Sequence, residues 1–141
     1  MFTRIFGLSA VAIGVCCLVF GVYGAVKAAS MGGDLLVEAN AGVIALDPAD
    51  WIARWRESCL MIAAAGAVAI VGGTMILKGR PLGFLLVAVI AVLLAVLPWI
   101  GQALGATRYA FEQASLAESL AEGAIAVAAL VAYGRSRRIA A

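Results

Sequence analysis

Residues 57–104 read ESCLMIAAAGAVAIVGGTMILKGRPLGFLLVAVIAVLLAVLPWIGQAL, which is two long apolar runs, 57–77 and 82–104, joined by a short basic turn. As a helix rising about 1.5 Å per residue, each run is long enough to cross a hydrocarbon layer of about 30 Å. The centre of the chain is therefore predicted to be a hairpin of two transmembrane helices.

Two further apolar runs flank this hairpin, residues 5–26 before it and residues 116–134 after it. The 141-residue chain is 65% hydrophobic and 13% charged, and its mean hydropathy is +1.10. These values lie outside the range of ordinary water-soluble domains. We therefore expect an all-α integral membrane protein, a four-transmembrane-helix bundle that forms a single domain over residues 1–141.

The charged residues are distributed unequally between the two predicted membrane sides. One side carries no acid, and its bases are Arg4, Lys78, Arg80, Arg135, Arg137 and Arg138. The other side has the acids Asp34, Glu38, Asp47, Asp50, Glu57, Glu112, Glu118 and Glu122, with the bases Lys27, Arg54, Arg56 and Arg108. Short cytoplasmic loops are enriched in Lys and Arg. Both termini and a basic tail, 135–141, are therefore expected in the cytoplasm of a bacterium, and the protein in its inner membrane.

The first apolar run permits a second interpretation, a secretory signal peptide cleaved after Ala28. Three membrane crossings would then remain. The run is about 22 residues long, whereas the apolar region of a signal peptide usually has about 7–15 residues, so an uncleaved helix is the favoured interpretation.

Small residues recur with a seven-residue spacing on the first two predicted helices. They are Gly7, Ala10, Gly14, Cys17, Gly21 and Gly24 on the first helix and Cys59, Gly66 and Gly73 on the second. Small side chains let helix backbones approach closely in a membrane. We predict that the two rows pack against each other with left-handed geometry. The alternative is chance, because the chain has 16 glycines.

The loop 27–56 is the longest predicted segment outside the membrane, and it should face outward. Its sequence Asp47-Pro48-Ala49-Asp50 is typical of a helix start, with Asp47 as the cap and proline at the first helical position. Residues 48–56 are therefore predicted to form a short interfacial helix before the second transmembrane helix.

All three tryptophans are expected near the outer membrane surface: Trp51, Trp55 and Trp99. An aromatic belt at the headgroup level explains this placement, and an outer face that binds a partner is the alternative.

Glu118 and Glu122 are four residues apart and share one face of the last helix. Acids within a membrane are costly and often functional, so these two residues, with Arg108 as an ion-pair partner, are candidates for handling protons or cations. Their alternative role is local, because Ser115 and Ser119 each precede a glutamate by three residues, as in a capping box.

The chain has no histidine, and Cys16, Cys17 and Cys59 are not placed to form a disulfide. Histidine-based metal, haem and nucleophile sites are therefore excluded. We expect no enzyme activity, no cofactor and no metal.

These observations favour a small non-enzymatic membrane protein that serves as an accessory or structural subunit of a larger complex. The alternative is a small proton- or cation-linked transporter or channel using Glu122 and Glu118. A membrane immunity or regulatory protein is a weaker alternative. The expected partners are membrane lipid and either other membrane subunits or further copies of the chain, with no nucleic acid.

Overall fold

The computed structural model describes residues 2–30, 48–103 and 116–140, and this part of the chain contains helices and no strands. The helices are α1, Phe2–Ser30, α3, Pro48–Leu77, α4, Leu82–Ala103, and α5, Leu116–Ala140. Three stretches are long and apolar enough to cross a membrane, namely Phe2–Ala28, Trp55–Leu77 and Leu116–Arg137. The protein is therefore helical and membrane-embedded. The apolar part of α4, Leu82–Leu97, is shorter.

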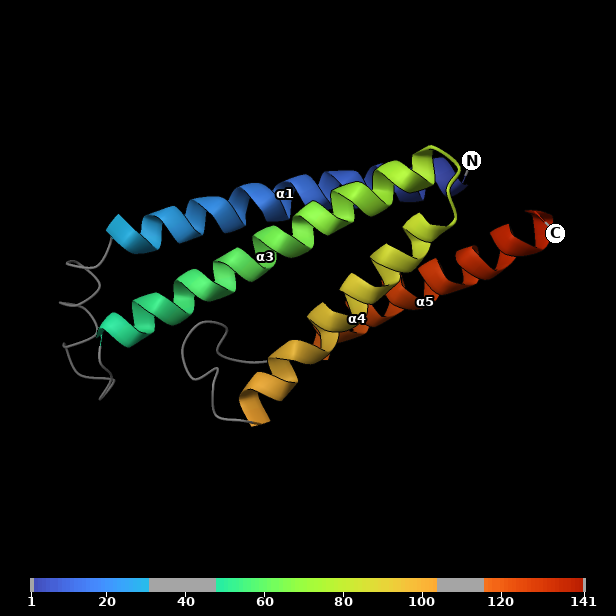
Figure 1. Cartoon of the computed structure of the whole chain (residues 1–141). Coiled ribbons are helices and arrows are strands. Elements are labelled where there is room, and N and C mark those ends of the chain that lie inside the picture. The colour runs from blue at the N-terminus through green and yellow to red at the C-terminus, as the bar shows by residue number, and fades with distance from the viewer. Residues whose placement is uncertain (1, 31–47, 104–115, 141) are drawn as a thin grey trace.

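The helices form two pairs, α1 beside α3 and α4 beside α5 (Figure 1). The pairs are joined by the turn between α3 and α4, and they move apart with distance from it (Figure 1). All four helices meet in one cluster near this turn. Its buried residues are Ala10, Ile76, Phe84 and Val87, and Phe6, Ala132 and Tyr133 pack against them.

The turn after α3 is a Schellman motif built on Gly79. The Gly79 N–H donates to the carbonyl of Ile76 at 2.9 Å, and the Arg80 N–H donates to that of Met75 at 2.8 Å. Gly79 has a φ of 73°, a left-handed conformation that glycine adopts without a Cβ penalty. Pro81 then favours the change of direction, since proline cannot continue the helix. α3 thus ends at Leu77 and α4 begins at Leu82, where the sequence has the end of one apolar run and the start of the next.

Three helices extend beyond the apolar runs that were predicted to cross the membrane. The first helix continues to Ser30, whose hydroxyl donates to the carbonyl of Lys27 at 2.9 Å. Residues 48–56 are the first turns of α3 rather than a separate interfacial helix. The predicted tail is helical as far as Ala140, because arginines are good helix formers and leaving an apolar environment does not end a helix. Asp47, the predicted cap of α3, lies outside the described residues.

Candidate functional site

The predicted rows of small residues lie between α1 and α3. Their contacts occur at three levels, Gly7 with Gly73, Gly14 with Gly66, and Gly21 with Cys59. Each step of seven residues forward on α1 corresponds to seven residues backward on α3, which is the register of an antiparallel pair. The seven-residue period therefore holds the two helices in the same relative alignment over the whole interface.

The two backbones also come close where Gly14 meets Gly66. A Cβ added at Gly14 would lie 2.7 Å from the Gly66 carbonyl oxygen, and one added at Gly66 would lie 2.6 Å from the Gly14 carbonyl oxygen. No larger residue fits either position without moving a helix. The other members of the rows belong to the same interface: Ala10 is buried, a Cβ on Gly66 would meet the Cys17 Cβ at 2.9 Å, and one on Gly24 would meet the Cys59 sulfur at 2.6 Å. Both rows are thus used inside the chain.

Trp99 and Trp55 lie in different environments. The Trp99 indole N–H donates to the Ser119 hydroxyl at 2.8 Å, and that hydroxyl donates to the Ala95 carbonyl at 3.2 Å. This chain of hydrogen bonds joins α5 to α4 on both sides of Pro98, a residue with no N–H for the helix ladder. Trp55 is half-buried beside Gly24. The side chain of Trp51 lies outside the described part.

Ser119 is not a helix cap, because α5 begins three residues earlier, at Leu116. The predicted capping box of Ser119 with Glu122 is therefore wrong, and the serine hydroxyl serves the contact with α4. The other capping box involves Ser115, which lies outside the described residues, as does Arg108, the predicted ion-pair partner.

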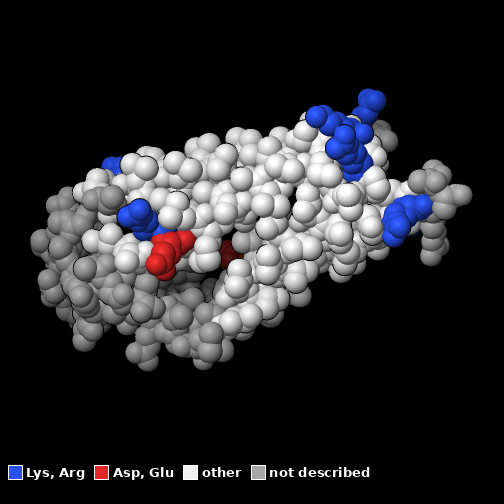
Figure 2. Space-filling model, viewed as in Figure 1, with Lys and Arg blue, Asp and Glu red and all other residues white. Residues whose placement is uncertain are grey.

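The two candidate acids differ in exposure. Glu118 is exposed in the first turn of α5, whereas Glu122 is half-buried one turn further along. Glu122 lies six residues into the helix, a rise of about 9 Å. Figure 2 shows a hollow in one face of the molecule with an acidic group recessed in it. Glu122 is therefore less accessible than Glu118.

The thiols of Cys16, Cys17 and Cys59 are free. Within residues 2–30, 48–103 and 116–140 no group of three or more His, Cys, Asp or Glu side chains could hold a metal ion.

A row on α5 that is exposed except at the half-buried Gly123 was not predicted from the sequence. Its members follow one another at intervals of four and three residues: Leu116, Leu120, Gly123, Val127, Leu130 and Gly134. Leu116 and Leu120 are each 65% exposed and Val127 is 62% exposed. Among the described residues, no atom would lie within 4 Å of a Cβ added at Gly123 or Gly134. The alternating spacing was a detectable signal for such a row, since it is the heptad pattern of packed helices.

A neighbouring row of α5 is covered, because it faces α4. Ala126 and Ala129 are buried there, and Ser119 supplies the hydrogen bond described above. α5 therefore presents one heptad-spaced face to its own partner helix and a second that the described chain leaves uncovered.

Comparisons with known protein families, with curated proteins and with solved structures found no match to this chain.

Proposed function

We propose that this protein is a small non-enzymatic subunit that packs against another helix of a larger membrane complex. The observation that supports this role is the row on α5, Leu116 to Gly134, which the described residues leave uncovered, with two glycines that no described atom approaches. In the proposed assembly the protein lies in the inner membrane of a bacterium, with both termini in the cytoplasm.

The physical argument concerns what a row of this kind does in lipid. Lipid tails are as apolar as leucine, so exposed leucine and valine side chains alone do not drive helix association. Glycines change this, because they let a second backbone approach and gain close van der Waals contact. The rows of α1 and α3 already make such contacts within the chain. The row on α5 has the same spacing and offers the same contact to a helix from outside.

The basic residues support the proposed orientation. Figure 2 shows blue groups gathered at one end of the molecule, without an acidic group among the described residues there. Arg4, Lys78, Arg80, Arg135 and Arg137 belong to the termini and the α3–α4 turn, which share this end (Figure 1). A positive side facing the cytoplasm is the usual arrangement in membrane proteins.

The test is purification from the native membrane in mild detergent, followed by mass spectrometry of stoichiometric companions. We expect membrane subunits to co-purify with the natural chain and to be lost from Gly123→Leu, whose added side chain blocks close approach. Ala124→Leu is the matched control, because Ala124 is exposed on α5 about 100° away from Gly123. Retention of the companions by Gly123→Leu, or no companion at all, would contradict the proposal.

A second candidate function is favoured by the half-buried Glu122. A carboxyl group at this depth suits a small transporter or channel that exchanges protons or cations. This function predicts an ion-dependent flux in liposomes that Glu122→Gln abolishes while the protein remains folded. The subunit function predicts no flux from either form.

A further inference from the structure

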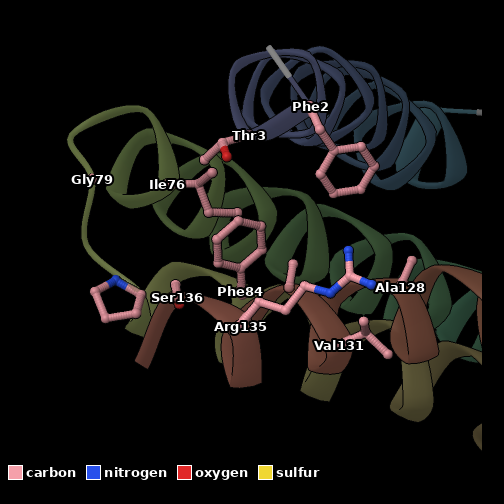
Figure 3. A pocket seen from close by; sticks show the side chains of 11 residues that line it. Phe2, Thr3, Ile76, Gly79, Phe84, Ala128, Val131, Arg135 and Ser136 are labelled. Atoms are coloured by element: carbon pink, nitrogen blue, oxygen red, sulfur yellow. The ribbon is translucent and has the colours of Figure 1, made fainter. Parts of the chain in front are cut away.

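A cavity of about 450 Å³ opens at the basic end of the molecule (Figure 3). It lies between the start of α1, the α3–α4 turn and the last turns of α5. Its walls are mostly apolar, with Phe2 from α1, Ile76 from α3, Phe84 from α4 and Val131 from α5. A cavity of this size lies in the range of small-molecule sites.

One cationic side chain, Arg135, lines this otherwise apolar space. Figure 3 shows it extending from α5 along the cavity. Arg135 is exposed and makes no hydrogen bond or ion pair within the described part of the chain. Its planar guanidinium carries five N–H donors, which match the oxygens of a phosphate group.

The surroundings of Arg135 add further positive charge. The ends of the chain and the α3–α4 turn supply Arg4, Lys78, Arg80 and Arg137. The Arg137 guanidinium carbon lies 5.9 Å from the centre of the Tyr133 ring, so this charge is held against α5. The acids within the described residues, Asp50, Glu57, Glu118 and Glu122, belong to the other half of α5 or to the start of α3. The field at the mouth of the cavity therefore favours an anion.

The cavity lies near one end of the apolar stretches that are predicted to cross the membrane. The three long apolar stretches reach Phe2, Leu77 and Arg137 at this end. The cavity is therefore at the level where the apolar layer gives way to headgroups. The apolar walls suit the apolar chain of an occupant, and the basic side chains suit an anionic phosphate.

We propose that the cavity binds an anionic phospholipid, with one acyl chain between Phe2, Phe84 and Val131 and the phosphate at Arg135. This site is independent of the row on α5, because it lies on a different face of that helix. It also differs from the general attraction of a basic surface for anionic lipid, since it requires a cavity of fixed shape.

The experiment is native mass spectrometry of the full chain in mild detergent, with added phosphatidylglycerol or phosphatidylcholine. We expect one phosphatidylglycerol to be retained in preference to phosphatidylcholine. Arg135→Gln should lower its retention about fivefold, the factor expected from one arginine near anionic lipid. Arg56→Gln is the matched control, because Arg56 is exposed at the far end of α3.

A second variant separates the cavity from the surface charge. Ala128→Leu adds an apolar side chain to the cavity wall and leaves every charge in place. It should reduce phosphatidylglycerol retention, whereas Ala124→Leu, outside the cavity on the same helix, should not. Circular dichroism verifies that the variants retain their helices.

Three results would overturn the proposal. The first is equal retention of both lipids by the natural chain. The second is a loss in Arg135→Gln without one in Ala128→Leu, which would indicate attraction to the basic surface alone. The third is a dimer in the natural chain that Ala128→Leu converts to a monomer, which would show that a second copy occupies the cavity.

Discussion

Replacing Gly66 by alanine should separate α1 from α3. The new methyl group would lie 2.6 Å from the Gly14 carbonyl oxygen and 2.6 Å from the Leu18 nitrogen, whereas ordinary contact begins at 3.4 Å. Both obstacles are backbone atoms, so no side chain can rotate out of the way. Ordinary contact is restored by a local separation of about 0.8 Å, the difference between 3.4 and 2.6 Å.

The expected cost follows from that displacement. A gap of about 0.5–1 Å removes a quarter to a half of each dispersion contact, and overpacking a tight interface usually costs about 1–3 kcal/mol. We expect Gly66→Ala to lower the free energy of unfolding by about 2 kcal/mol. Gly14→Ala should have a similar effect, because its Cβ would lie 2.7 Å from the Gly66 carbonyl oxygen.

The assay is unfolding by sodium dodecyl sulfate in mixed micelles, followed by the fluorescence of Trp55. Trp55 reports this interface because a Cβ on Gly24 of α1 would lie 4.0 Å from its indole nitrogen. Phenylalanine at positions 51 and 99 removes the other two tryptophans. The midpoint of the transition should move to lower detergent fraction in Gly66→Ala.

Gly123→Ala is the control for the intrinsic effect of the same substitution. A Cβ at Gly123 meets no atom of the described residues within 4 Å, so the expected effect is that of helix propensity. Alanine favours a helix by up to about 1 kcal/mol relative to glycine, and this variant should be unchanged or more stable. Equal shifts of the midpoint in Gly66→Ala and Gly123→Ala would refute the assigned register of α1 and α3.

Three further predictions concern the turn, the α4–α5 contact and the topology. Gly79→Ala should destabilise the protein by about 1 kcal/mol in the same titration, since a residue with a Cβ is strained at a φ of 73° and no described atom lies within 4 Å of the added Cβ. Asparagine at this position should cost less, and an equal cost for both would argue against backbone strain as the cause. Ser119→Ala should cost about 0.6–1.7 kcal/mol, because the Trp99 indole loses its acceptor and the Ala95 carbonyl loses a donor. The emission of Trp99 should change in that variant, and an unaltered spectrum would contradict the hydrogen bond. A single cysteine placed within residues 40–50 should react with an impermeant maleimide in intact cells, whereas labelling only after lysis would reverse the proposed orientation.

Much of the helical pattern was predictable because apolar length and turn residues act locally. The end of α3 and the start of α4 follow from Gly79 and Pro81, whose backbone preferences need no tertiary context. The other ends were harder to predict. The arginines after residue 134 favour leaving the membrane but do not end a helix, so α5 continues to Ala140.

The register of α1 with α3 was only partly predictable. The seven-residue spacing identified which residues could form a row on each helix. The same spacing also fits a pairing in which one helix is shifted by seven residues, so it does not fix the register. The structure pairs Gly14 with Gly66 and Gly7 with Gly73, an alignment that depends on where the antiparallel helices begin and end. The role of Ser119 was misjudged for a related reason. A serine three residues before a glutamate matches a capping box in sequence, and the α4 carbonyl that it meets is 24 positions away.

The cavity near Arg135 was not predictable from the sequence. Its walls come from the start of α1, the α3–α4 turn and the end of α5, which are distant along the chain. Their meeting depends on how the two helix pairs cross, and no local pattern encodes that angle.

The pairing of α1 with α3 has a consequence for the order of assembly during synthesis. Every close contact between these two helices joins residues that precede Lys78, so the first hairpin is complete in sequence before α4 leaves the ribosome. Chains fold from the amino terminus as they are made, and self-contained units form first. The contacts that fix the register of α1 and α3 can therefore form before α4 and α5 are made. α4 and α5 then insert beside a finished surface, against which the cluster around Ile76 and Phe84 closes last.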